Sequence, residues 1–311
     1  MGKGSKKKIV IWILGVIVIA ILAGFAYIYS QMNKINTVEI QKGNDELNIS
    51  NEAAELDSSI TNIAFFGLSM NPGEDNSTDS IMILSIDQKR NKLKVSSIMR
   101  DTYVDLADGR GANNIKNAYR FGGPTLAIKT LNSNYDLNIK NYVTVNDEGF
   151  DKLIDSIGGV EIDIKDYEVP IMRTVGIYSS GKYTLSGKQA LAYCRDRKLG
   201  NGDFERTERQ RTVLTKVFEK MQTVQITKYP AIISDMLPYV ETSMNKGEII
   251  SLASTVFPKM KTLEPARFPV DGYWFEDKKP GEYYYIVANI KTTAYQMHRF
   301  IYDDSKPVGK Y

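Results

Sequence analysis

The sequence predicts an α/β fold with three layers, in which a central mixed β-sheet lies between helices, preceded by one N-terminal transmembrane helix. Three observations predict it. Strand patterns and helix patterns alternate along the chain, as in sheets covered by helices on both faces. An uncharged run of 21 residues, Ile9 to Tyr29, is long enough to cross a bilayer. Charged residues make up 25% and hydrophobic residues 42% of the chain, which is ordinary for a globular domain.

The N-terminal run is expected to be a retained anchor. Four lysines precede it, so the positive-inside rule keeps the N-terminus in the cytoplasm and places the rest of the chain outside the cell. A cleaved signal peptide is the alternative, but its apolar region is shorter and ends at an A-x-A-like site that this chain lacks. The expected organisation is a cytoplasmic tail at 1–8, an anchor at 9–29, an extracellular stalk at 30–60 and one domain at 61–311.

Within the domain, β-rich runs and amphipathic runs follow one another. Strands are expected at 61–68, 80–87, 92–99, 141–146, 160–164 and 266–270, with a hairpin turn at the QKRN stretch of 88–91. Helices are expected at 122–135 after a glycine pair, at 146–159 between a polar cap and a second glycine pair, from about 203 onward, at 247–257 and at 289–304.

The composition excludes several kinds of chemistry. The chain has one cysteine, Cys194, and one histidine, His298, far apart in the sequence. Cysteine–histidine and serine–histidine–aspartate catalysis are therefore not expected, and neither is a zinc site. We expect Cys194 to be a small core residue and His298 to be a packing or surface residue. The net charge of +3 gives no argument for nucleic acid.

Five arginines gather where one helix begins. Arg195 and Arg197 precede the stretch GDFERTERQR, residues 202–211, which runs into an amphipathic helix. With about 100° per residue, Arg206 and Gln210 fall on the apolar stripe of that helix, while Arg209 and Arg211 flank it. A buried guanidinium needs an anion. Two sources remain open: an internal network of ion pairs with nearby carboxylates, or a bound phosphate at the helix N-terminus.

Two further charged points lie at strand ends. Arg100 and Asp101 follow a buried strand, and Asp79 precedes another. Charged side chains at strand ends of an α/β sheet often face the ligand crevice. One carboxylate among several arginines suits a metal–phosphate site. The chain has neither a P-loop nor a G-x-G-x-x-G motif, so nucleotide use is not indicated.

Six blocks of this sequence resemble the LytR-CpsA-Psr family. They are TDSIMILSID, SSIMRDTYVDL, NIKNAYRFGGPTLAIKTL, VTVNDEGFDKLIDSIGGVEIDI, LSGKQALAYCRDR and GDFERTERQRTVL, which occur in the family's order over residues 61–221. The resemblance implies a membrane-anchored extracellular phosphotransferase of mainly Gram-positive bacteria. Such proteins move a glycopolymer, of teichoic acid or capsular polysaccharide type, from a polyprenyl-pyrophosphate carrier to peptidoglycan.

The resemblance also implies roles for single residues. The pyrophosphate would be held by Arg100, Arg195, Arg197, Arg206 and Gln210. Asp79 would bind Mg²⁺, and Arg100, Asp101 and Asp203 would be catalytic, with Asp203 a candidate base. The lipid tail would lie in an apolar groove. The implied partners are the lipid-linked glycopolymer, the peptidoglycan acceptor and the bilayer.

The sequence departs from the family pattern at the expected metal site. Ser69 stands where the first metal aspartate is expected, and Ser77 stands where an arginine is expected. Glu74 or Asp75, in the same loop, could supply the missing carboxylate. Weakened Mg²⁺ binding is therefore expected. Two alternatives to transfer stay open: a protein that binds lipid-linked intermediates without turning them over, and a hydrolase that uses water on the same pyrophosphate.

Overall fold

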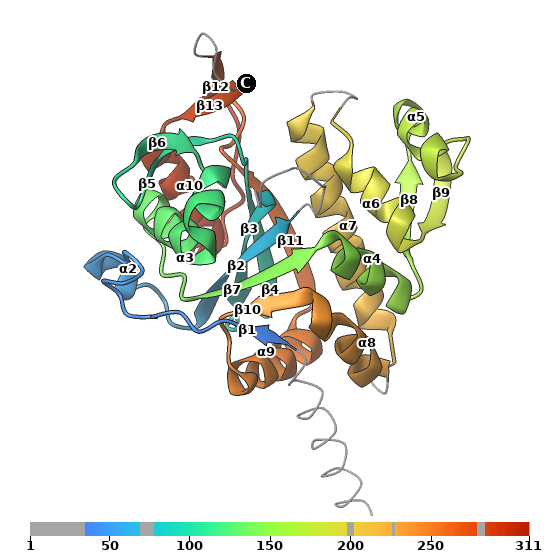
Figure 1. The fold of residues 1–311 in the computed structure, drawn as a ribbon, viewed down its shortest axis with the longest axis horizontal. Helices are drawn as coiled ribbons and strands as arrows, with labels where there is room; N and C mark the ends of the chain where they lie inside the picture. Colours follow the sequence, from blue (N-terminus) through green and yellow to red (C-terminus); the bar gives the residue numbers. More distant parts are fainter. Residues whose placement is uncertain (1–34, 69–77, 198–201, 226–227, 279–283, 311) are drawn as a thin grey trace, which may run out of the picture.

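A computed structural model describes residues 35–68, 78–197, 202–225, 228–278 and 284–310 (Figure 1). Its centre is a seven-stranded mixed sheet in the order β1-β10-β7-β2-β3-β4-β11. The sheet strands are β1 (Asn36–Thr37), β2 (Ile60–Leu68), β3 (Thr78–Asp87), β4 (Lys92–Ile98), β7 (Asn141–Asn146), β10 (Val240–Thr242) and β11 (Thr262–Phe268). Three two-stranded sheets surround it: β5 (Tyr103–Leu106) with β6 (Gly111–Asn114), β8 (Val160–Ile164) with β9 (Gly181–Leu185), and β12 (Trp274–Lys278) with β13 (Tyr284–Ala288).

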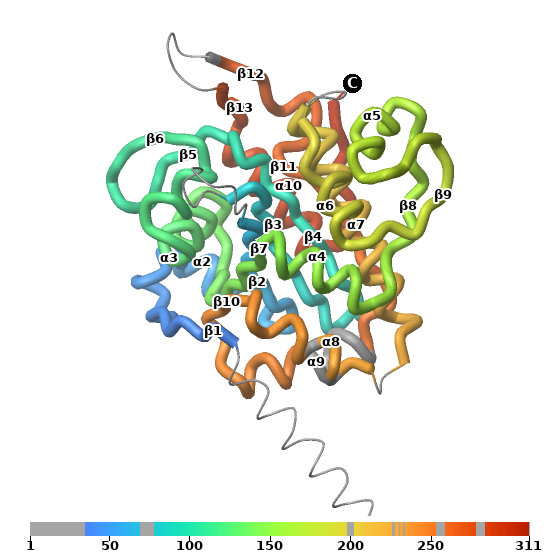
Figure 2. The backbone as a smooth tube through the Cα atoms, turned by 45° about the vertical axis from the view of Figure 1, so that its right-hand side comes forward, coloured from blue at the N-terminus to red at the C-terminus, as the bar shows by residue number. Residues whose placement is uncertain are grey.

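Helices cover both faces of the central sheet (Figures 1 and 2). They are α2 (Asn51–Ala54), α3 (Lys116–Tyr135), α4 (Asp147–Ser156), α5 (Val169–Met172), α6 (Gly187–Arg195), α7 (Asp203–Thr223), α8 (Tyr229–Met236), α9 (Lys246–Lys259) and α10 (Ile290–Ile301). α3 and α10 lie on one side, and α4, α6 and α7 lie on the other. The expected α/β architecture is confirmed for the described residues.

Alternating side chains of the central strands pack into separate cores on the two faces of the sheet. Ala64 and Phe66 of β2 belong to the core under α3 and α10, whereas Ile63 packs on the other face with Phe218 of α7. This period of two is what a strand buried on both faces requires. Phe66 is fully buried, and burial of such a side chain contributes about 1.5–3 kcal/mol to folding.

The strand directions bring several chain segments to one edge of the sheet. β2 and β7 are parallel, and β3 runs antiparallel to both β2 and β4. The carboxyl ends of β2, β4 and β7 therefore meet at the edge where β3 begins. In an α/β sheet such an edge is where ligands bind.

Three local expectations need correction. α3 begins at Lys116, before the expected start, and continues across a kink at Gly122 and Gly123, where Gly123 has a φ of 61° that only glycine adopts freely. The strand at 160–164 exists, but it pairs with β9 outside the central sheet. The last sheet strand begins earlier than expected, at Thr262, where it adds in parallel to β4.

The described part of the expected stalk packs on the domain. β1 pairs with β10 at the edge of the sheet, and Leu47, Ile49 and Ala53 are buried in the core under α3. These apolar side chains are spaced irregularly and therefore give no periodic signal in the sequence. The expected anchor at 9–29 lies outside the described residues. Among the residues that are described, no helix is both long and apolar enough to cross a membrane.

Candidate active site

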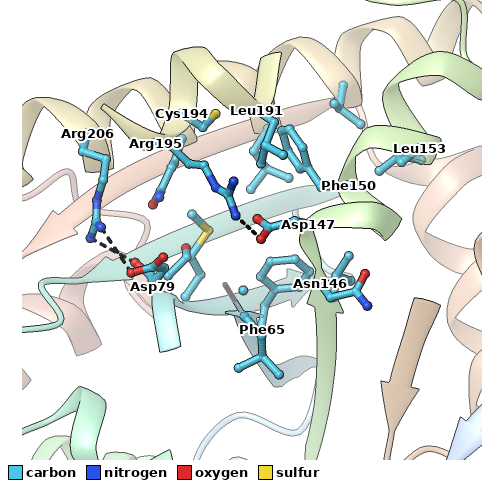
Figure 3. Close-up of a pocket in the computed structure, with 18 residues that line it drawn as sticks. Phe65, Asp79, Asn146, Asp147, Phe150, Leu153, Leu191, Cys194, Arg195 and Arg206 are labelled. Atoms are coloured by element: carbon cyan, nitrogen blue, oxygen red, sulfur yellow. Dashed lines mark hydrogen bonds and ion pairs between the residues drawn. The ribbon is translucent and has the colours of Figure 1, made fainter. Parts of the chain in front are cut away.

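Asp79, near the start of β3, is the centre of a charged cluster. Its Oδ1 atom accepts hydrogen bonds from Arg100 Nη1 and Arg197 Nη2, each at 2.6 Å, and lies 3.4 Å from Arg206 Nη1. Arg206 Nη2 also donates to the main-chain oxygen of Asp79 at 3.0 Å. Figure 3 shows Arg206 reaching down to Asp79. Three guanidinium groups from distant parts of the sequence therefore converge on one carboxylate.

The register of the sheet positions two of these residues. β3 and β4 are antiparallel, with Ile81 opposite Ile98. Two residues beyond this pair, the same register sets Asp79 opposite Arg100. The register of the two strands therefore brings the carboxylate and the guanidinium together, and opposite charges on adjacent strands stabilise each other.

Arg206 is the most deeply buried member of the cluster, with 2% of its side chain exposed. Its Nη2 atom lies 2.7 Å from Asp203 Oδ1, one helical turn earlier in α7, and that oxygen is also 3.4 Å from Arg100 Nε. Burial lowers the pKa of Arg206 to about 10; the charge of Asp203 opposes the shift and that of Arg100 reinforces it. The guanidinium is still protonated at neutral pH.

The cluster is both an ion-pair network and a cationic site. Arg100, Arg197 and Arg206 bring three positive charges, and Asp79 and Asp203 bring two negative charges. Asp101, beside Arg100, adds a negative charge that Lys116 balances, so one positive charge stays in excess. The sequence left open whether the arginines pair with internal carboxylates or with a bound phosphate, and these two possibilities do not exclude each other. An internal carboxylate neutralises the arginines, and the same arginines can exchange it for a phosphate, whose oxygens match their forked donors.

Arg195 lies at another point of the site. It extends from the last turn of α6 and pairs with Asp147 in the first turn of α4 (Figure 3). Arg197, two residues further on, reaches Asp79 instead. The two arginines of the YCRDR stretch therefore lie at different points of the site.

An apolar cavity with a volume of ≈ 190 Å³ opens beside the cluster. Asp79, Arg206 and Gln210 line it together with Arg195. Its remaining wall is largely apolar, and includes Phe65, Met82, Phe150, Leu153, Leu191, Leu214 and Val217. Figure 3 shows Arg206 and Asp79 on one side of this space and Phe150 and Leu153 on the other. Such a site accepts an anionic head joined to an apolar tail.

Asp101 is held from three directions. Lys116 Nζ contacts its Oδ1 atom at 2.5 Å, and Asn114 Nδ2 donates to the same atom at 3.2 Å. Arg100 Nε lies 3.6 Å from Oδ2. These contacts fix the position of the Asp101 carboxylate beside Arg100.

The sequence matches one known family over most of the chain. The model of the LytR-CpsA-Psr family matches residues 22–299. The chain belongs to this family. Among its relatives, the polyisoprenyl-teichoic acid–peptidoglycan teichoic acid transferase TagU of Bacillus cereus (strain AH820) is 28% identical over 292 residues, which covers 91% of this chain and 94% of the relative. TagU of Oceanobacillus iheyensis is 29% identical over 301 residues, with 92% and 91% covered.

Solved structures of LytR-CpsA-Psr proteins share the fold. TagT bound to LI-WTA superposes with a TM-score of 0.69 at 20% identity and covers 86% of this chain and 98% of its own. YwtF (TagT) with bound octaprenyl pyrophosphate lipid gives 0.64 at 19% identity, covering 85% and 99%. TagV of B. subtilis gives 0.63 at 26% identity, covering 81% and 100%.

The structure brings most of the site residues expected of the family together. Asp79, Arg100, Arg197, Arg206 and Asp203 form one cluster. Asp101 joins it through Arg100, while Arg195 and Gln210 line the adjoining cavity. The departures from the family pattern, Ser69 and Ser77, lie outside the described residues, as do Glu74 and Asp75.

Arg209 is a buried arginine beside the site whose role the helix pattern does not predict. It was expected to flank the apolar stripe, yet its side chain is only 3% exposed. Its Nε atom donates to the main-chain oxygen of Tyr193 at 2.9 Å, and its Nη2 atom donates to that of Asp196 at 2.6 Å. Arg209 thereby satisfies carbonyl groups at the end of α6, which a helix leaves without partners. Helix periodicity gives no signal for it because the acceptors come from another helix.

Cys194 and His298 have the structural roles expected of them. Cys194 is buried in the core between α4, α6 and α7, and this burial raises the pKa of its thiol to about 12. A thiol of this kind is inert at neutral pH. His298 Nε2 forms a hydrogen bond with the main-chain oxygen of Tyr135 at 2.9 Å, on the opposite side of the sheet from the cluster.

The described residues do not by themselves fit a magnesium ion. Asp79 offers one carboxylate, and its Oδ1 atom is already shared by Arg100, Arg197 and Arg206. Elsewhere in the described ranges, no three aspartate, glutamate, histidine or cysteine side chains are grouped to hold a metal. Mg²⁺ needs several oxygen ligands in near-octahedral geometry. The expectation of Mg²⁺ therefore depends on residues 69–77, which lie outside the described ranges, and stays a prediction.

Proposed function

We propose that this protein is a phosphotransferase that moves a glycopolymer from a polyprenyl-pyrophosphate carrier to peptidoglycan. The observation that carries the proposal is an arginine cluster around Asp79 opening onto an apolar cavity. A lipid pyrophosphate combines several negative charges with an apolar tail, so it matches both halves of this site. Membership of the LytR-CpsA-Psr family and the similarity to TagU support the same conclusion.

In the proposed reaction, an acceptor hydroxyl oxygen attacks the phosphorus that bears the glycan. A new phosphodiester bond to the acceptor forms, and the bond between this phosphorus and the bridging oxygen breaks. Polyprenyl phosphate leaves with the bonding electron pair. Chemistry of this type depends mainly on positioning and on neutralising charge. No cysteine or histidine is needed.

The arginines would neutralise the pyrophosphate in this reaction. Arg206, Arg100 and Arg197 would release Asp79 and bind phosphate oxygens in its place. Arg195 would turn from Asp147 toward the same phosphates. Because Arg206 is almost wholly removed from water, its charge acts over a low-dielectric path and is weakly screened.

Asp203 would accept the proton of the attacking hydroxyl. Neither of its buried carboxylate oxygens has a hydrogen bond of good geometry within the described residues, although Arg206 and Arg100 lie close to Oδ1. Asp101, by contrast, is held by Lys116 and Asn114. It would act by orienting Arg100 rather than by taking a proton.

The proposed location is the cell membrane, with a single anchor at 9–29 and the domain outside the cell. This part rests on the lysine-flanked apolar run of the sequence. The full-length protein should sediment with membranes, and protease added to intact cells should remove the domain. Recovery of the full-length protein in the soluble cytoplasmic fraction would contradict it.

The transfer proposal is tested with Arg206→Lys and Arg206→Ala, using a polyprenyl-pyrophosphate-linked glycopolymer and peptidoglycan. Both variants should lose at least about tenfold in lipid-pyrophosphate affinity, because a point charge cannot replace two parallel charged hydrogen bonds. Arg110→Lys, at an exposed arginine paired with Asp108, is the control and should behave like the parent.

The products distinguish transfer from the two alternatives. Labelled polymer attached to peptidoglycan supports transfer. Polymer phosphate released into solution, with no attachment, indicates a hydrolase. Binding of the lipid with neither product indicates a binding protein and would overturn the proposal. Equal binding by the parent and both Arg206 variants would show that Arg206 has only a structural role.

A further inference from the structure

A second pair of arginines lies on another side of α7 from the pyrophosphate cluster. Arg211 is seven residues after Phe204, so the two share one face of the helix. Arg211 is five positions after Arg206, which turns the two arginines about 140° apart around the helix axis. The face with Arg211 is turned toward β11, which carries Arg267.

Arg267 is held over an aromatic stack. Its guanidinium carbon lies 4.6 Å from the centre of the Phe204 ring, and the Phe204 ring stacks on Trp274 of β12 with centroids 4.4 Å apart. A cation above an aromatic face is stabilised by the ring quadrupole. The side chain also pairs with Asp271, which is 68% exposed and therefore free to turn into solvent.

Arg211 has a buried donor without an acceptor in the described part of the chain. Its Nη1 atom is buried and has no hydrogen-bond partner among the described residues. The Nε1 atom of Trp274 is a second buried donor without an acceptor in that part of the chain. Glu208 and Asp271 act on Arg211 only as nearby charges, while Arg267 repels it.

Burial and the charge of Arg267 lower the pKa of Arg211 to about 10, so it remains charged at neutral pH. An unpaired charge removed from water is costly. A ligand anion bound between Arg211 and Arg267 would remove this cost. It would also reduce the repulsion between the two positive charges.

We propose that Arg211 and Arg267, beside the stacked rings of Phe204 and Trp274, form a second anion site that binds a phosphodiester group of the glycopolymer. Forked guanidinium donors match phosphate oxygens. The aromatic stack offers an apolar surface to the polyol or sugar that a polymer phosphate carries on each side. The assignment to the glycopolymer rests on the proposed function, whereas the anion site does not.

The second site differs from the pyrophosphate cluster in what its arginines contact. Arg206 is neutralised by Asp79 and Asp203, within its own pocket. Arg211 has no such internal anion in the described chain. Because Phe204 follows Asp203 directly, the two sites flank the first turn of α7, and one polymer chain would pass from one to the other.

The test is isothermal titration of the full-length protein in detergent with a short glycerol phosphate oligomer, inorganic phosphate and an unphosphorylated oligosaccharide. The oligomer should bind the parent and Arg206→Ala. Arg211→Gln and Arg267→Gln should each lower its affinity about tenfold, the loss expected for one charged hydrogen-bonded contact. Arg299→Gln, at a half-exposed arginine of α10, is the matched control and should change nothing.

Two outcomes would overturn the site. One is loss of oligomer binding in Arg206→Ala with retention in Arg211→Gln, which would place the phosphate in the first cluster. The other is a melting temperature that falls in Arg211→Gln, since removal of an unpaired charge should leave it unchanged or raise it. Equal affinity for inorganic phosphate and the oligomer would overturn the assignment to the polymer.

The outcomes also separate this inference from the proposed function. A protein that binds the oligomer through Arg211 but transfers no polymer refutes the transfer proposal and leaves the second site intact. A protein that transfers polymer with unchanged KM for the polymer donor in Arg211→Gln and Arg267→Gln refutes the second site alone.

Discussion

Arg206 contacts Asp79 twice, through the main-chain oxygen at 3.0 Å and through the carboxylate at 3.4 Å. The pair joins α7 to the first residues of β3. It therefore links the helix to the sheet and also neutralises the buried charge of Arg206. In the proposed reaction, a phosphate would take the place of this carboxylate among the guanidinium groups.

Replacing Asp79 by asparagine should destabilise the ligand-free protein. Arg206 would keep only Asp203 as its anion, and breaking a buried pair usually costs 3–5 kcal/mol. We expect a smaller loss of about 2–4 kcal/mol because one carboxylate remains. Urea unfolding of Asp79→Asn measures it, with the exposed pair variant Asp108→Asn as control.

Inorganic pyrophosphate should reverse part of this loss. It would supply the negative charge that Asp79→Asn removes, so it should raise the melting temperature of the variant more than that of the parent. An equal rise in both proteins would contradict the view that Asp79 and the ligand compete for the same guanidinium groups.

Arg209→Lys should affect both stability and binding. The variant loses the hydrogen bonds to the main-chain oxygens of Tyr193 and Asp196, with an expected cost of about 2–4 kcal/mol. Asp196 lies between Arg195 and Arg197 in the sequence, so the last turn of α6 and the residues that follow it, which carry the two arginines, should shift. Lipid-pyrophosphate affinity should fall at temperatures where the variant is fully folded.

Arg90→Gln provides the comparison for Arg209→Lys. Arg90 pairs with the buried Asp87 at the far end of the β3–β4 hairpin, so the variant should lose stability without losing affinity. If Arg209→Lys shows the same pattern as Arg90→Gln, Arg209 has no positioning role.

Cys194 should resist alkylation in the folded protein. Burial raises its pKa from 9.0 to about 12, so the nucleophilic thiolate is scarce at pH 8. Iodoacetamide should label it only after denaturation, and Cys194→Ala should retain lipid-pyrophosphate binding. Rapid labelling of the native protein with loss of binding would show that the thiol is reactive.

The same shift predicts a pH effect on stability. The unfolded thiol ionises near pH 9.0, whereas the folded thiol stays neutral up to about pH 12. The unfolded state therefore binds fewer protons above pH 9, and the stability of the parent falls as pH rises through this window. Cys194→Ala should lose less stability than the parent between pH 8 and 10, as measured by urea unfolding at each pH.

Magnesium should bind the free protein weakly. Asp79 is shared by three arginines, and the family position of a second carboxylate is Ser69. Titration of the parent should show tighter Mg²⁺ binding once lipid pyrophosphate is present. The double variant Ser69→Asp with Ser77→Arg should bind Mg²⁺ more tightly than the parent. Tight binding by the parent that Asp79→Ala leaves unchanged would rule out the metal role of Asp79.

The sequence by itself determined the α/β class, most of the central strands and the family. The strands at 61–68, 80–87, 92–99 and 141–146 were readable because burial on both faces requires long β-rich runs. It also determined that Arg206 points inward, because its place on the apolar stripe follows from the helix repeat.

Only the tertiary structure decided which charges meet. Asp79 contacts Arg197 and Arg206, which are 118 and 127 residues away, and Arg195 takes Asp147 instead. Sequence periodicity describes one element at a time, whereas an ion pair depends on where two elements pack. For the same reason, the sequence did not show that Arg209 is buried, because its main-chain acceptors lie at the end of α6. It also did not show that Nη1 of Arg211 is buried without a partner in the described chain.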